Sequence, residues 1–194
     1  MGAFSKLFSF EDQLGFYGAY HANPINVGIH MVFVPTIFWT ALVWAANTPA
    51  AFEYAYSQYL PANLSLFATV GYASYFIALE PLAGTLYAPI LLGMCRAANV
   101  FLQTNPKANS IAALLHVASW VAQFAGHFLA EGRAPALFDN LLQSLVLAVF
   151  FVWVELLFML GYRPDLRKRL EAKIKKDIEA YKKAKQAKAD GKSN

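Results

Sequence analysis

Apolar segments separated by short polar breaks fill the chain from residue 9 to residue 162. In the first segment, residues 9–21, Leu14 and Tyr17 follow Phe10 at helical spacing and share one face. Ser9 is suited to cap this helix, and acidic residues follow in the first turn, where the helix dipole favours them. The pattern predicts a short amphipathic helix.

A polar break, Asn23-Pro24, ends this helix because the residue before a proline avoids the helical conformation. The next segment, Val27–Ala46, is nearly all apolar and has the length of about 20 residues that a bilayer span requires. We expect Asn26 to cap this second helix and Pro35 to kink it.

The remaining apolar segments predict four more helices, over residues 64–79, 82–95, 111–130 and 141–161. Glu80-Pro81 separates the first two, Arg96 ends the second, and Asp139 or Asn140 is expected to cap the last. The first two are short and interrupted by Gly and Pro. Tilted spans, a re-entrant hairpin and buried core helices therefore all remain open for them.

Beyond residue 163 the composition changes to Lys, Ala, Glu and Asp. An apolar strip persists there, formed by Leu166, Leu170, Ile174, Ile178 and Tyr181. A basic amphipathic helix suits an anionic membrane surface, and a solvated, frayed helix is the alternative. We divide the chain into a helical membrane domain, residues 1–162, and a basic amphipathic tail, residues 163–194, which the positive-inside rule places in the cytosol.

The composition is that of a membrane protein. Hydrophobic residues make up 58% of the chain and charged residues 14%, against roughly 45–50% and roughly 25% in an average soluble protein. The apolar composition excludes intrinsic disorder, and a single cysteine, Cys95, excludes a disulfide scaffold. The predicted fold class is all-α: a multi-helix integral membrane bundle with an N-terminal amphipathic helix and a basic C-terminal helix.

The net charge of +4 conceals an asymmetry. Residues 163–194 hold 12 of the 16 Lys and Arg residues but only 5 of the 12 Asp and Glu residues, so this tail carries +7 and the rest of the chain −3. Nucleic-acid binding requires basic residues interleaved with stacking aromatic ones, and here the aromatic residues lie in the apolar part. We therefore expect a lipid bilayer, and no nucleic acid, as a partner.

Four histidines lie inside or beside the apolar segments. His21 and His30 flank the Asn23-Pro24 break, and a corner between two helices lets their side chains converge on one point. Neutral imidazoles are common metal ligands. Asn23 and Asn26 lie at the same corner and are expected to support the ligands from behind.

A polar face runs along the predicted helix 111–130, formed by His116, Trp120, Gln123, His127 and Glu131. Polar side chains are costly to bury, so this face must meet partners, water or a metal rather than lipid. His116 and His127 are about 16 Å apart along the helix axis, so both cannot bind one ion unless the helix bends. We favour His127 as the ligand, with Gln123 and Glu131 orienting its ring.

Each histidine taken singly fits a hydrogen-bonded core residue as well. The placement of all four outside the polar tail favours a metal site. One cysteine and the lack of paired-ligand spacing argue against structural zinc, whereas histidine ligation with open positions suits Fe(II). Glu80 and Glu155 are alternative ligands or proton carriers, and a hydrogen bond to a neighbouring helix or to Arg96 is their simpler role.

Several runs of residues, in order along the chain, resemble the fungal 2-hydroxy fatty acid dioxygenases. The runs are Gln13–Tyr17, Tyr20–Val27 with His30, Val34–Ile37, Trp120–His127, Arg133–Leu137 and Asp139–Leu141. The resemblance implies an endoplasmic-reticulum membrane enzyme of fatty acid α-oxidation that requires Fe(II) and acts in the degradation of phytosphingosine. His21, His30 and His127 match the family pattern.

The implied reaction cleaves the C1–C2 bond of a 2-hydroxy long-chain fatty acid with O2 and releases CO2 and an acid one carbon shorter. A 2-hydroxy acid can chelate iron through its carboxylate and hydroxyl. We hypothesise that His21, His30 and His127 are catalytic iron ligands, with His116 as a fourth ligand or a partner of the substrate carboxylate. The apolar helices would hold the acyl chain.

The residues expected to bind the substrate are Tyr17, Tyr20 and Trp120. Two alternatives remain at this point. The same fold and iron can act on another hydrophobic hydroxylated substrate, because a fold does not determine a function. The chain can also be a non-enzymatic membrane or lipid-binding protein in which the histidines only bridge helices.

Overall fold

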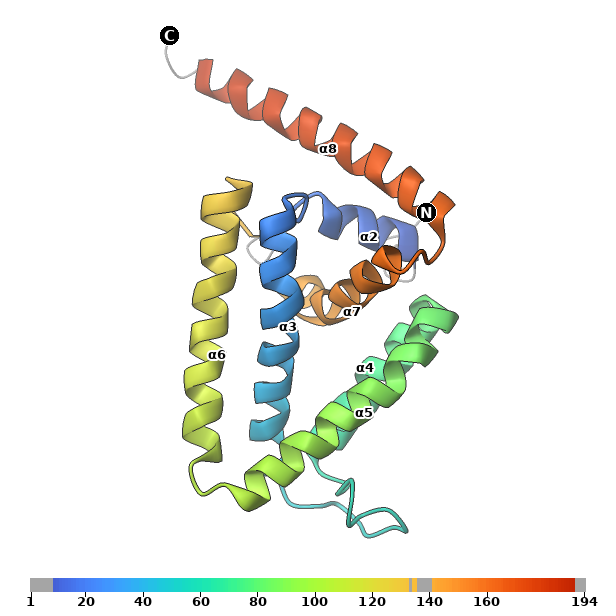
Figure 1. The fold of residues 1–194 in the computed structure, drawn as a ribbon, viewed down its shortest axis with the longest axis vertical. Coiled ribbons are helices and arrows are strands. Elements are labelled where there is room, and N and C mark those ends of the chain that lie inside the picture. Colours follow the sequence, from blue (N-terminus) through green and yellow to red (C-terminus); the bar gives the residue numbers. More distant parts are fainter. Residues whose placement is uncertain (1–8, 133, 136–140, 191–194) are drawn as a thin grey trace.

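The computed structural model describes residues 9–132, 134–135 and 141–190, and all regular secondary structure within these ranges is helical (Figure 1). The elements in order are α2 (Phe10–Gly18), α3 (Pro24–Ala45), α4 (Leu64–Leu79), α5 (Pro81–Thr104), α6 (Ala108–Ala125), the π-helix η1 (Gly126–Glu131), α7 (Leu141–Met159) and α8 (Pro164–Asp190). The predicted all-α class is confirmed.

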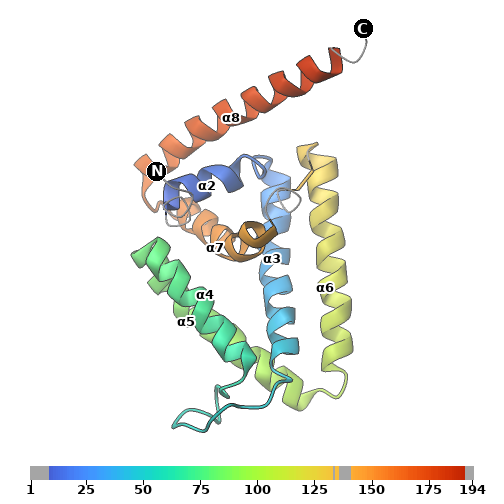
Figure 2. The same cartoon turned by 180° about the vertical axis from the view of Figure 1, so that it is seen from behind.

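Two helix pairs form the frame of the molecule. α3 and α6 lie side by side and antiparallel, and α4 and α5 form a second close pair inclined to the first (Figures 1 and 2). α7 packs against α2, α3 and α5. The core between these helices is apolar and includes the fully buried side chains of Phe76, Phe150 and Leu42.

Three helical segments are long and apolar enough to cross a membrane: Pro24–Ala45, Pro81–Thr104 and Ala108–Glu131. α4 is shorter. The axes of α7 and α8 meet at 119°, so this pair could form only a broken span or a re-entrant loop. The multi-helix membrane bundle expected from composition therefore has candidate spans at both helix pairs.

Two predicted helix boundaries are wrong. α3 begins at Pro24, and Asn23, not Asn26, caps it by accepting a hydrogen bond from the Ile25 amide. Proline at the first helical position needs no hydrogen-bond partner for its nitrogen, so the break itself starts the helix. α5 does not end at Arg96, whose guanidinium lies 5.0 Å from the ring centre of Tyr59.

Other boundary residues agree with the prediction or cannot be compared. Ser9 occupies the N-cap position of α2, although its side chain makes no capping hydrogen bond. α7 ends just before Gly161, whose φ of +88° is the left-handed conformation that glycine favours. The expected caps Asp139 and Asn140 lie outside the described residues.

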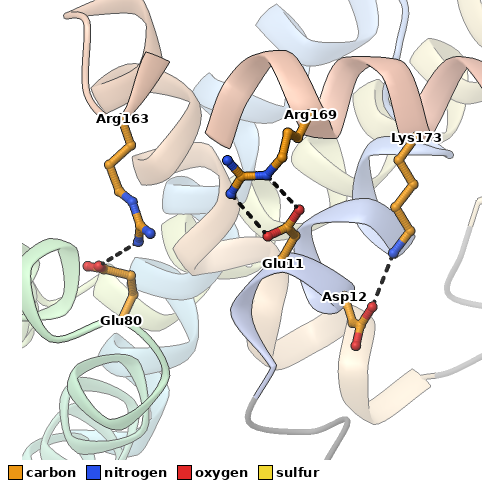
Figure 3. Close-up of polar contacts among 6 residues, drawn as sticks. All are labelled: Glu11, Asp12, Glu80, Arg163, Arg169 and Lys173. Carbon is orange, nitrogen blue, oxygen red and sulfur yellow. Dashed lines mark hydrogen bonds and ion pairs between the residues drawn. The ribbon is translucent and has the colours of Figure 1, made fainter. Parts of the chain in front are cut away.

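The basic helix α8 docks on α2. Leu166 and Leu170, from the predicted apolar strip, are each 3% exposed. Ion pairs join Arg169 to Glu11 and Lys173 to Asp12, at 3.4 and 3.1 Å (Figure 3). The start of this helix is thus part of the packed structure, and the division of the chain at residue 163 stays a prediction.

A third ion pair links the junction of α4 and α5 to the junction of α7 and α8. The Glu80 carboxylate caps α5 through the Ala83 amide and lies 3.1 Å from Arg163, in the turn between α7 and α8 (Figure 3). Glu80 therefore has the structural role anticipated for it, with Arg163 in place of Arg96 as its partner.

We predict that Gly84→Ala destabilises the α4–α5 pair. A Cβ atom at Gly84 would collide with the backbone of Phe76 and Ile77, so the two helices would have to separate. We expect a loss of about 1–3 kcal/mol in the free energy of unfolding, as for other overpacked sites. Thermal unfolding in detergent measures it.

The matched control is Gly93→Ala on the same helix, where a Cβ atom meets nothing within 4 Å. It should leave the unfolding midpoint unchanged or raise it, because alanine favours the helix over glycine. Equal midpoints for the two variants would contradict the close packing.

Candidate metal centre

Three histidines meet at one point inside the bundle. One potential ligand atom from each of His21, His30 and His127 lies within 4.8 Å of the other two. The ring centres are 4.4 to 4.9 Å apart, and the residues are 8%, 3% and 3% exposed, respectively. This buried triad contains the three histidines that the sequence favoured as ligands.

The corner after α2 brings the first two rings together. His21 lies just beyond α2 and His30 in the second turn of α3. The Nδ1 atom of His21 donates to the Tyr17 carbonyl, and that of His30 donates to the Asn26 carbonyl, both at 2.9 Å. Because a carbonyl only accepts, the proton of each neutral ring is on Nδ1, which leaves the Nε2 lone pair available to a metal.

His127 enters the site from the π-helix η1. A π-helical turn shifts side chains relative to the preceding α-helix, and such turns are frequent at functional sites. Gly126, at the start of η1, allows close approach to α3, because a Cβ atom there would lie 2.5 Å from Asn26 Oδ1. The third ring therefore depends on a local departure from α-helical geometry.

The electrostatics favour neutral rings. Burial lowers the pKa of His21 well below its usual value, and the neighbouring His30 and His127 lower it further, against the hydrogen bond to the Tyr17 carbonyl. The neutral imidazole is the form that coordinates metals. The surroundings of His21 thus favour the form of this ring that can bind a cation.

Three residues expected to support the ligands form one clamp. Glu131 Oε1 accepts hydrogen bonds from the Asn23 amide at 2.7 Å and from Asn26 Nδ2 at 3.3 Å. Asn23 Nδ2 donates to the Ala130 carbonyl at 2.9 Å. These contacts join the corner to the end of η1 and so hold His127 opposite the other two rings. An orienting contact of Glu131 on the His127 ring stays a prediction.

His116 lies apart from the triad. Its Nε2 accepts from Trp120 Nε1 at 3.0 Å, and its Nδ1 lies 2.8 Å from Thr40 Oγ1. Both ring nitrogens are therefore used within the protein. The structure does not bring His116 to the position of a fourth ligand, in agreement with its distance along the helix.

A cavity of about 260 Å³ adjoins the triad. Apart from the triad, its lining is mostly apolar and aromatic: Tyr17, Val34, Ile37, Phe38, Ala41, Tyr72, His116, Trp120, Gln123, Phe124, Pro135, Ser144, Leu145, Ala148 and Val149. Tyr17 and Trp120, which the sequence analysis expects to bind the substrate, are both part of this lining. Tyr20 is buried beside Phe16 and is not part of this lining.

Sequence reasoning missed Tyr72 and Ser144 among the lining residues. Tyr72 stands on α4 amid other aromatic residues and carries no distinguishing signal. Ser144 directly follows Gln143 in the mainly apolar α7, and this pair of polar residues is the pattern that could have identified it.

The donor set fits a divalent transition metal. Three neutral imidazoles, with no carboxylate or thiolate in the described cluster, leave open coordination positions beside an apolar cavity. Open positions are the mark of a catalytic rather than a structural site.

Comparison with known proteins places this site in a family. The sequence model described as 2-hydroxy-palmitic acid dioxygenase Mpo1-like matches residues 7–160. The chain belongs to this family. The match includes the triad and the cavity and stops before α8.

A curated relative in Saccharomyces cerevisiae, the 2-hydroxy-palmitic acid dioxygenase MPO1, is 38% identical over 167 residues. The alignment covers 85% of this chain and 89% of the relative. No solved structure matches the chain. The family expected from the sequence motifs is confirmed.

We predict that His21→Ala, His30→Ala or His127→Ala each lowers the affinity for a divalent metal by at least about tenfold, since changes even behind the ligands cost this much. His116→Ala is the control and should retain the metal, because its ring is bonded elsewhere. Metal-to-protein ratios of the purified variants test this. Loss of the metal from His116→Ala, in which the triad is intact, would refute the assignment.

Proposed function

We propose that this protein is an Fe(II)-dependent dioxygenase that cleaves the C1–C2 bond of 2-hydroxy fatty acids. One 2-hydroxy acid and one O2 give CO2, water and a fatty acid one carbon shorter. The observation that carries the proposal is the buried His21–His30–His127 triad beside an apolar cavity, in a chain that belongs to the 2-hydroxy-palmitic acid dioxygenase family.

The triad would hold the iron through one ring nitrogen of each histidine, which is Nε2 in His21 and His30. Bound there, Fe(II) supplies open coordination positions for the substrate oxygens and O2, and the electrons that activate O2. The Tyr17 and Asn26 carbonyls fix the orientation of His21 and His30, and the clamp at Glu131 fixes the corner. Burial of all three rings excludes bulk water from the reacting atoms.

The shape of the cavity orients the substrate. His30 and Ala41 on α3 are 11 positions apart, as are His116 on α6 and His127 on η1, so the lining extends about 16 Å along α3. The triad end is buried, whereas Ala41 is exposed and Leu145 is 40% exposed. The carboxyl end of the substrate therefore belongs at the triad, with the acyl chain toward the open end.

The reaction belongs, on this proposal, to fatty acid α-oxidation in the degradation of phytosphingosine, and the substrate is a 2-hydroxy long-chain acid. Support comes from the substrate in the name of the yeast relative and from the apolar lining of the cavity.

Oxygen uptake by the purified, iron-loaded protein tests the function. We expect consumption of O2 with 2-hydroxypalmitate and none with palmitate, which lacks the 2-hydroxyl, together with formation of the acid one carbon shorter. His30→Ala should lower the rate at least about 100-fold by removing a ligand. O2 uptake only with other hydroxylated lipids would show that the substrate is one of those lipids. Lipid binding without O2 uptake would show that the protein is a non-enzymatic lipid carrier.

We also propose that the protein is a multi-pass membrane protein of the endoplasmic reticulum with its C-terminus in the cytosol. The three long apolar helices and the basic charge of α8 support this topology. An epitope placed after residue 194 should be cleaved by protease added outside sealed microsomes. Protection of the epitope until the membrane is dissolved would reverse the orientation.

A further inference from the structure

Several buried polar atoms of the cavity lack hydrogen-bond partners. Among the residues that the structure describes, Tyr17, Gln123 and Ser144 line the cavity, and the Tyr17 hydroxyl, Gln123 Nε2 and the Ser144 hydroxyl have no hydrogen-bond partner in the protein. Tyr17 and Gln123 are each 8% exposed. Buried donors without acceptors are rare in folded proteins because the loss of hydration is not compensated. Their convergence on one cavity from three helices indicates a polar ligand group.

Two of these donors adjoin the triad. The Tyr17 ring stacks on the His21 ring, with centres 3.7 Å apart and planes 11° apart. Gln123 lies near the end of α6, four positions before His127, and both residues line the cavity. Both donors thus belong to the buried end of the cavity, where the proposed function places the carboxyl group.

The cavity offers no formal charge to balance an acid. Its described lining contains no Asp, Glu, Lys or Arg residue. A carboxylate entering it depends on a metal and on neutral donors. A tyrosine hydroxyl carries its proton at neutral pH and can donate a hydrogen bond. An amide nitrogen such as Gln123 Nε2 donates at any pH.

We propose that Gln123 and Tyr17 donate hydrogen bonds to the substrate carboxylate and select an acid over an otherwise identical alcohol. This inference rests on the proposed function and assigns Gln123 a role different from orienting His127. Hydrogen bonds to a charged acceptor are stronger than those between neutral groups, so the two donors favour the ionised acid. They also hold C1 next to the triad while the acyl chain follows the apolar lining.

Equilibrium binding under anaerobic conditions tests the proposal without turnover. The probes are 2-hydroxypalmitate and 1,2-hexadecanediol, which has the same chain and 2-hydroxyl but no carboxylate. Gln123→Met keeps the length of the side chain without its donor, and Tyr17→Phe removes only the hydroxyl. Each variant should bind the acid about tenfold more weakly and the diol within twofold of the unchanged protein, with its metal content retained.

Ser119→Ala is the matched control on the same helix. Ser119 is buried one turn before Gln123, and its hydroxyl donates to the Leu115 carbonyl rather than lining the cavity. This variant should bind both probes as the unchanged protein does. In aerobic assays, Gln123→Met should raise KM for the acid more than it lowers kcat.

Equal losses for the acid and the diol, or loss of metal from Gln123→Met, would overturn the proposal, because they indicate a general effect on packing or on His127. Unchanged acid binding by both variants would overturn it too. These outcomes differ from failure of the proposed function, which would appear in the unchanged protein as a lack of O2 consumption with 2-hydroxypalmitate.

Discussion

The clamp between the Asn23-Pro24 corner and the end of η1 is the interaction on which the arrangement of the histidine triad depends. Asn23 is bonded to Glu131 and to the Ala130 carbonyl, more than 100 residues away in sequence. These bonds tie the end of η1, which carries His127, to the corner that carries the other two histidines. The clamp lies in a partly buried place, where hydrogen bonds to a carboxylate are stronger than in water.

Burial determines the chemistry of the triad. Three imidazoles in one apolar pocket cannot all carry charge, because burial and mutual repulsion oppose protonation. They remain neutral, and the carbonyl partners of His21 and His30 fix which nitrogen is available. The same surroundings leave Gln123 and Tyr17 with unpartnered donors. The properties that make this cavity unfavourable for polar groups thus suit it to a metal and a carboxylate.

α7 and α8 support the histidine triad indirectly, by packing against α2. α2, which carries Tyr17 and leads to His21, is held by α7 beneath and by α8 above. Exposed ion pairs such as Lys173–Asp12 contribute about 0–1 kcal/mol each, so the buried Leu166 and Leu170 account for most of this attachment. Other basic residues of α8, including Lys175, Lys176 and Lys182, are exposed.

The sequence by itself determined the helices, the corner and which three histidines were the candidates to meet there, because apolar periodicity and an Asn-Pro break act over a few residues. Local pattern favoured the wrong cap, Asn26 instead of Asn23, since both are good capping residues and only the geometry at Pro24 distinguishes them. It also could not show that Arg96 would be accommodated within α5. Tertiary structure alone decided that Glu131 binds the corner, that His116 is bonded to Trp120 and Thr40, and that Gln123 and Ser144 face one cavity with Tyr17. Each of these depends on how distant helices pack, which spacing along the chain does not encode.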